Sequence, residues 1–332
     1  MTRIAPTLEA FFTERMTNQR RASPHTVASY RDSLRMLVSF AQRQTGVPPA
    51  RLDFADLDAH LVGSFLDYLE RERGLSVRSR NVRLAAIHSL FRFAALRHPE
   101  HAAGIQRVLA IPQKRWEVND VCFLNPEEVE ALIAAPDRSS RIGRRDHALL
   151  VLAVQTGLRV SELTALRRGD VQLGPAAHVV CRGKGRKSRS TPLTRSTART
   201  LGTWLQEVSL DPEAAVFPGP RGQPLSRDAI RRAVARHCCV AEHHCPTLRS
   251  KRVTPHTLRH TCAMSLLRSG VDLATIALWL GHEGIETTQI YLHADLALKE
   301  KALALTGSGP GARAGRRYQA PDSLIAFLDG LG

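Results

Sequence analysis

The sequence TPHTLRHTCAMSLLRSG occupies residues 254–270 and predicts a capped helix. Thr254 suits the N-cap, and Pro255 fits the first helical position because an N–H there would have no intrahelical partner. Three basic side chains then recur at i, i+3 and i+4, a spacing that places them on one helix face. These are His256, Arg259 and His260. A basic face near a helix N-terminus predicts a phosphate site, in which we expect His260 to play a supporting part.

Two further motifs lie before and after this helix in the chain. A Thr-Gly-Leu-Arg run places Arg159 just beyond a predicted helix end. A Leu-Gly-His run ends at His282, after a helix predicted to start at Asp272, and Tyr291 stands nine residues later. Arginine suits phosphate because its planar fork matches two oxygens and neutralises charge as the transition state forms. A tyrosine nucleophile with such a clamp can break a phosphodiester without a metal or a cofactor.

Proton transfer is the next requirement of such a site. The phenol of Tyr291 has an ordinary pKa of about 10, so a neighbouring base or nearby cations must help it lose its proton. His256 or His282 could take that proton. Lys184, at the tip of a predicted hairpin, could donate a proton to the leaving oxygen as a general acid, with Lys187 as a competing candidate.

Composition narrows the class of partner. The chain has 332 residues, which favours two domains, and a formal net charge of +16. Such an excess favours DNA or RNA, with an anionic membrane surface as the rival, yet the longest apolar run, Ala148–Val154, is far too short for a bilayer span. The six cysteines lack framework spacing and no secretory leader is recognisable, so we expect a cytoplasmic, nucleoid-associated protein with reduced thiols. The His/Cys-rich residues 237–245 match no standard zinc spacing, and we expect no metal there.

Hydrophobic periodicity predicts a mainly α protein with a small β-sheet, an α+β class. We expect a helical domain over residues 1–116, a second domain over 120–301, and a tether with a terminal helix over 302–332. The helices predicted from periodicity and capping residues span 7–44, 58–73, 78–96, 144–156, 226–240, 254–269 and 272–280, with another starting at Asn125. Residues 177–194 read as a hairpin, and residues 99–124 read as irregular.

One predicted helix carries an arginine-rich face. The segment 74–97 contains no acidic residue, so we expect phosphate contacts there rather than a merely solvated surface. The predicted DNA contacts, including the basic linker and the hairpin, are Arg78, Arg80, Arg83, Lys114, Arg115, Arg186 and Lys187.

Together these motifs resemble the catalytic domain of the tyrosine recombinases, the phage integrase family, in which the pattern runs Arg, Lys, His-x-x-Arg, His, Tyr. The matching positions are Arg159, Lys184, His256, Arg259, His282 and the nucleophile Tyr291. Glu162 also matches a residue often found in that site. The N-terminal part resembles the family's helical core-binding, SAM-like domain, and the resemblance covers about residues 7–301.

The resemblance implies a site-specific DNA recombinase. In that family the tyrosine forms a 3′-phosphotyrosyl link, a 5′-hydroxyl leaves, and a partner strand's hydroxyl reverses the step. Double-stranded DNA, a homo-oligomer forming a tetrameric synapse or sister recombinases, and a C-terminal helix that docks on a neighbouring protomer are then expected. The resemblance implies neither a metal nor a cofactor.

Two other functions use the same residues differently. A catalytically idle DNA-binding accessory protein would have lost at least one of the six positions, and none is missing. A relaxing enzyme of the type IB topoisomerase kind would use the same chemistry on one duplex, and would usually lack the helical N-terminal module.

Overall fold

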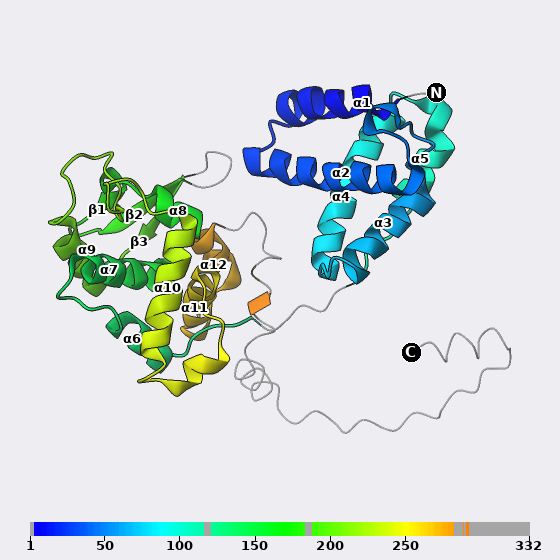
Figure 1. The fold of residues 1–332 in the computed structure, drawn as a ribbon. Helices are drawn as coiled ribbons and strands as arrows, with labels where there is room; N and C mark the ends of the chain where they lie inside the picture. Colours follow the sequence, from blue (N-terminus) through cyan, green and yellow to red (C-terminus); the bar gives the residue numbers. More distant parts are fainter. Residues whose placement is uncertain (1–2, 116–120, 183–187, 282–287, 289, 292–332) are drawn as a thin grey trace, which may run out of the picture. The chain divides into compact units, whose positions relative to one another are not determined.

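The computed structural model describes residues 3–115, 121–182, 188–281, 288, 290 and 291. The chain divides into two compact units, Met1–Val118 and Asn119–Gly332, each of which we describe by itself (Figure 1). None of the described helices combines the length and the apolar character that a membrane-spanning helix needs.

The first unit is a helical bundle. Its helices are α1 (Ile4–Ala10), a π-helical continuation (Phe11–Gln19), α2 (Pro24–Thr45), α3 (Ala59–Arg71), α4 (Val77–Ala95) and α5 (Ala102–Leu109), with short 3₁₀ turns at Pro49–Arg51 and Pro99–His101. Helix α4 packs against α2, α3 and α5, and its buried residues, among them Leu84, Ile87 and Phe91, form the centre of the core. Aliphatic and phenylalanine side chains supply most of this packing.

The structure refines two predictions in this unit. Residues 7–44 are helical except at a break before α2, where Ser23 and Pro24 form the helix start that their sequence predicts: the Ser23 hydroxyl caps the Thr26 amide, and Pro24 has no N–H to continue an earlier helix. Arg21 takes a positive φ of 44° at this break. Residues 99–124 are not wholly irregular, because α5 forms there and buries Ile105 and Val108. Two buried positions are too few for periodicity to reveal a helix.

The second unit consists of helices and one small sheet, which lies at one edge of the unit near α7, α8 and α9 (Figure 1). The helices are α6 (Pro126–Ala134), α7 (Arg141–Thr156), α8 (Val160–Ala165), α9 (Arg195–Leu205), α10 (Arg227–Ala241), α11 (Pro255–Arg268) and α12 (Leu273–Leu280), with 3₁₀ turns at Arg168–Asp170 and Pro246–Ser250. Strands β1 (Val171–Gln172), β2 (His178–Arg182) and β3 (Ser188–Pro192) pair antiparallel in that order, and Cys181 lies opposite Arg189. Helix α7 packs against α9 and α11. The predicted fold class, mainly α with a small sheet, is confirmed.

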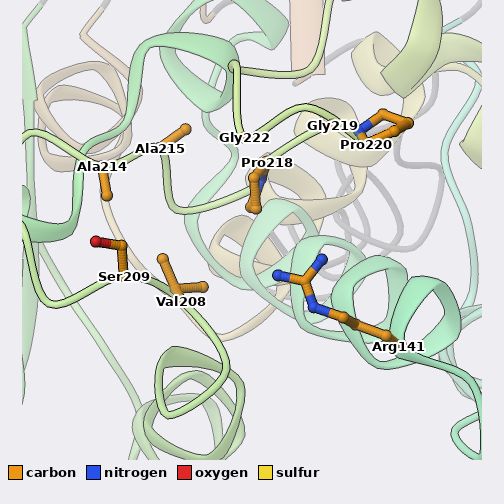
Figure 2. A pocket seen from close by; sticks show the side chains of 9 residues that line it. All are labelled: Arg141, Val208, Ser209, Ala214, Ala215, Pro218, Gly219, Pro220 and Gly222. Atoms are coloured by element: carbon orange, nitrogen blue, oxygen red, sulfur yellow. The ribbon is translucent and has the colours of Figure 1, made fainter.

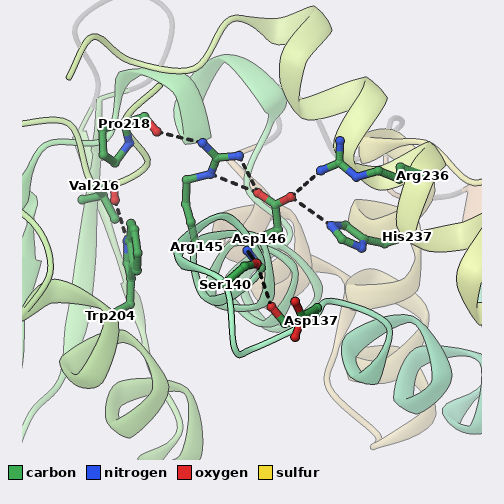
Figure 3. Close-up of polar contacts among 10 residues, drawn as sticks. Asp137, Ser140, Arg145, Asp146, Trp204, Val216, Pro218, Arg236 and His237 are labelled. Carbon is green, nitrogen blue, oxygen red and sulfur yellow. Dashed lines mark hydrogen bonds and ion pairs between the residues drawn. The ribbon is translucent and has the colours of Figure 1, made fainter. Parts of the chain in front are cut away.

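A buried carboxylate ties α7 to α10 (Figure 3). Asp146 on α7 accepts hydrogen bonds from Arg145 (Nη2 to Oδ1, 2.8 Å), from Arg236 (Nη2 to Oδ2, 2.7 Å), and pairs with His237 (Nε2 to Oδ2, 2.9 Å). Burial alone would raise the pKa of Asp146, but the hydrogen bonds from His237 and Arg145 outweigh it and hold the pKa below its usual value. His237, from the His/Cys-rich segment, is therefore engaged with a carboxylate.

We expect Asp146→Asn to destabilise the protein by about 3 kcal/mol at neutral pH, because it removes the buried counter-charge that holds the partly buried Arg145, the exposed Arg236 and the buried His237. Since the folded pKa is depressed, this stabilisation is complete above the unfolded pKa of about 4 and is lost as pH falls through the lower folded value. Urea unfolding of the wild type and of Asp146→Asn should therefore show a difference in stability that narrows as the pH falls below about 4. Asp228→Asn, which changes an exposed ion pair, is the control; equal losses for the two variants would contradict the prediction.

Candidate active site

Helix α11 begins as its sequence predicts. The Thr254 hydroxyl accepts a hydrogen bond from the Thr257 amide at 3.3 Å, and Pro255 stands at the first helical position. The three basic residues of this helix differ in burial, because His256 is exposed, His260 is half-buried, and Arg259 is only 5% exposed. The basic face is thus split between an outer histidine and an inner arginine.

The two predicted arginines bind backbone carbonyls at helix ends. Arg259 donates from Nη1 to the Gly157 oxygen (2.7 Å) and from Nη2 to the Leu280 oxygen (2.8 Å). Arg159 donates from Nη2 to the Gly281 oxygen (2.7 Å). Carbonyls at a helix C-terminus lack intrahelical partners, so the guanidinium groups satisfy them and bring the ends of α7 and α12 to α11. Both glycines have the left-handed φ, 62° and 65°, that ends a helix in this way.

A carboxylate orients the first arginine. Glu162 accepts the Arg159 amide at 2.7 Å and the Arg159 Nη1 at 3.2 Å. It also forms a two-pronged ion pair with Arg189 of β3, at 2.8 and 2.9 Å. Burial alone would raise the pKa of Glu162, yet the hydrogen bonds from Arg189 and from the Arg159 amide hold it below its usual value. Sequence reasoning missed Arg189, since nothing in the basic hairpin sequence distinguishes it from its neighbours.

The predicted nucleophile is enclosed. Tyr291 is 1% exposed and packs with the apolar side chains of α11 and α12, among them Met264 and Ile276. Its hydroxyl lies 3.0 Å from Nδ1 of His260, and the two rings meet edge to face. The residue that touches the phenol is therefore His260, for which the sequence predicted only a supporting part.

Burial governs the protonation of this pair. It raises the pKa of Tyr291 to about 12, with the charges of Arg259 and Arg159 acting in the opposite direction. Burial, followed by the proximity of His256 and Arg259, lowers the pKa of His260 to about 4. At neutral pH the hydrogen bond therefore joins a protonated phenol to a neutral imidazole.

The pKa values of His256, the other predicted base, and of the buried Arg259 are also lowered. Partial desolvation and the charges of Arg259 and Arg159 lower the pKa of His256, so it is neutral and can accept a proton near neutral pH. Burial and repulsion by Arg159 lower the pKa of Arg259 to about 10. Arg259 therefore keeps its positive charge at neutral pH, and the site retains both guanidinium charges.

The remaining predicted residues are placed as follows. Lys184, Arg186, Lys187 and His282 lie outside the described residues. In the first unit Arg78 and Arg115 are exposed, Arg83 donates to the Ser33 hydroxyl at 2.9 Å, and Lys114 pairs with Glu70 at 3.0 Å.

Arg80 departs from the expected exposed face. Its side chain is buried, pairs with Glu70 of α3 at 3.3 Å, and donates to the Pro112 oxygen at 3.1 Å. It therefore supports the packing of α4 against α3 and the following linker, and we do not retain it among the phosphate contacts. The helical pattern did not reveal this, because residue spacing does not show that Arg80 lies beside Glu70 of another helix.

A separate pocket of about 250 Å³ lies beside the N-terminus of α7 (Figure 2). The loop residues from Val208 to Gly222 line it together with Arg141. Its lining among the described residues is mostly alanine, proline and glycine, with Arg141 as the charged member, and we assign no chemistry to it.

Comparison with known proteins identifies both units. The phage integrase family matches residues 122–297, and the N-terminal SAM-like domain of phage integrases matches residues 10–98. The Sinorhizobium fredii protein y4rC, which carries the name integrase/recombinase, is 54% identical over 328 residues, covering 99% of this chain and 98% of the relative. The tyrosine recombinase XerC of Chlamydia muridarum is 33% identical, over 87% of this chain and 94% of its own length.

Solved structures share the fold. The Tn1549 transposon integrase bound to a circular intermediate DNA has a TM-score of 0.70 at 16% identity, covering 92% of this chain and 99% of that one. The XerH recombinase on its difH substrate has a TM-score of 0.66 at 22% identity, covering 87% and 82%. With both of its units matched and relatives similar over nearly their whole length, this chain belongs to the phage integrase family of tyrosine recombinases.

Proposed function

We propose that this chain cuts and rejoins DNA at specific sites through Tyr291 and without a metal ion. The phenolic oxygen attacks phosphorus, the bond to the 5′-oxygen breaks, and a 3′-phosphotyrosyl link keeps the energy of the broken bond. The observation that carries the proposal is the position of the phenol. Tyr291 contacts the histidine next to Arg259 and lies within the field of both arginines.

The arginines supply the charge that the transition state requires. Arg159 and Arg259 are each held by contacts to backbone carbonyls through their terminal nitrogens. Because each guanidinium has five N–H donors, both retain donors for non-bridging phosphate oxygens. We assign the acid that protonates the leaving 5′-oxygen to Lys184, and a second phosphate contact to His282, from their positions in the sequence.

Because the proposed nucleophile is buried, its activation requires a rearrangement that we assign to DNA binding. A side chain that is 1% exposed cannot reach a scissile phosphate, so Tyr291 must leave its apolar cluster before it reacts. Its proton then goes to a base, and in the arrangement described His260, with a pKa of about 4, is too weak a base to take it. His256, exposed and neutral, is the acceptor that we propose.

Positive surface residues would hold the duplex. We propose phosphate contacts by Arg78, Arg83, Lys114, Arg115, Arg186 and Lys187. Structures of lambda integrase, which shares the fold at 19% identity, include a tetramer on a Holliday junction. We propose a comparable assembly of four protomers, either of this chain or with sister recombinases, acting in the cytoplasm where the nucleoid lies.

The first test is a covalent adduct. Duplexes bound by Tyr291→Phe can be selected from a random pool and rebuilt with a nick that traps the cleaved state. We expect the wild type to give a protein–DNA adduct on a denaturing gel, with or without EDTA, and Tyr291→Phe to give none. An adduct in the Phe variant would overturn the nucleophile, and loss of activity in EDTA would overturn the metal-free chemistry. Binding without any adduct would favour the idle DNA-binding alternative.

The second test concerns the clamp. We expect Arg159→Ala and Arg259→Ala to slow adduct formation about 100-fold or more, because each removes roughly 3 kcal/mol of charge stabilisation in the transition state. DNA affinity should change little at fixed salt. The Lys variants test geometry, because lysine keeps the charge but loses the fork. Adduct formation by either Ala variant at the wild-type rate would contradict the clamp.

The third test measures the pKa of the buried Tyr291 phenol. The difference in absorbance between wild type and Tyr291→Phe during alkaline titration should show one phenol with a pKa of about 12. In urea the same phenol should ionise near its ordinary value of about 10. Because the folded pKa is raised, the burial of the neutral phenol stabilises the fold fully below about pH 10 and progressively less above it. A folded-state midpoint near 10 would refute the enclosed position.

A further inference from the structure

Arg189 joins three parts of the site. It lies on β3, five residues after Lys184 in the sequence. Its Nη1 and Nη2 donate to the two carboxylate oxygens of Glu162 at 2.8 and 2.9 Å. Its Nε donates to the Trp279 oxygen, near the end of α12, at 3.0 Å. The side chain of Arg189 is 15% exposed, and that of Glu162 is 5% exposed, so this contact is largely shielded from water.

We propose that Arg189 is a positioning residue for strand cleavage, which neutralises Glu162 and anchors the end of α12 so that Arg159 remains available to the phosphate. The proposal rests on the function proposed above, because it assigns Arg189 a part in that reaction. Arg189 is not itself a catalytic residue, since Nε, Nη1 and Nη2 are all engaged with Glu162 and Trp279.

The first reason is charge balance. The proposed phosphate position is surrounded by three guanidinium groups and one carboxylate, which together carry a net charge of +2. These groups belong to Arg159, Arg189, Arg259 and Glu162. Without Arg189 the buried Glu162 carboxylate would have Arg159 as its one described cationic partner. A buried carboxylate binds a guanidinium strongly, and the planar fork favours a two-pronged contact. Arg159 would then neutralise Glu162 instead of the transition state.

The second reason is geometry at the end of α12. Three consecutive carbonyls, those of Trp279, Leu280 and Gly281, are bound by Arg189, Arg259 and Arg159 respectively. Gly281 lies so close that a β-carbon there would be 2.7 Å from Nη1 of Arg189. In the sequence Tyr291 follows Gly281 by ten residues, so Arg189 holds the end of α12 from which the chain continues to the proposed nucleophile.

The test separates charge balance from mere packing. Adduct formation is measured on the same nicked duplex for wild type, Arg189→Met, Glu162→Gln and the double variant Arg189→Met/Glu162→Gln. The matched control is Arg144→Met, which removes another two-pronged arginine–glutamate pair, with Glu207, at 2.6 and 3.1 Å. Thermal midpoints and DNA affinity are measured for every variant, so that loss of folding or binding is recognised.

We expect Arg189→Met to form the adduct about 100-fold more slowly than wild type, with DNA affinity changed less than about threefold. The double variant should form the adduct at least about tenfold faster than Arg189→Met, because removing the carboxylate frees Arg159 again. Packing loss alone would make the double variant as slow as the single one or slower, and that result overturns the proposal. Arg144→Met should form the adduct at the wild-type rate.

Arg189→Lys covers the case in which the Met variant does not fold. Lysine keeps the charge but cannot make the fork, so we expect adduct formation about tenfold slower than wild type, and a wild-type rate would overturn the proposal. Failure of the two proposals is distinguishable. If the wild type and Arg144→Met form no adduct, the proposed function fails; if they form it and Arg189→Met forms it equally fast, only the role of Arg189 fails.

Discussion

The contact between guanidinium groups and the last carbonyls of α12 is the interaction on which the site depends. Arg159, Arg189 and Arg259 come from different parts of the second unit, and each binds a carbonyl between Trp279 and Gly281. A helix C-terminus carries partial negative charge and unsatisfied acceptors, so it can hold cations that would otherwise repel one another. The helix end thus gathers the positive charge that a phosphodiester requires.

Burial and charge act against each other at Tyr291, the proposed nucleophile. The apolar cluster of α11 and α12 makes the phenol of Tyr291 harder to ionise, while Arg259 and Arg159 make it easier. In the arrangement described, burial prevails, and the hydroxyl is held by His260. In the mechanism that we propose, the same guanidinium charges act more strongly on a phenolate once a phosphate and the tyrosine share a site from which water is excluded.

Local sequence predicted the elements whose ends carry a capping residue. Ser23, Asp58, Thr254 and Asp272 each cap the helix that follows them, because a short side-chain oxygen can satisfy a free amide without help from the rest of the chain. Periodicity failed where an element buries only one or two side chains, as in α5. It also failed at Arg80, whose partner Glu70 belongs to another helix and cannot be recognised from residue spacing.

The amino-acid sequence by itself determined the family, because the types and order of Arg159, His256, Arg259 and Tyr291 match the motif of the tyrosine recombinases. Only the tertiary structure decided which histidine touches the phenol, that Arg189 shares Glu162 with Arg159, and that Tyr291 is buried. The physical reason is that reactivity of a residue type is local, whereas burial and ion pairing depend on neighbours that are distant in the chain.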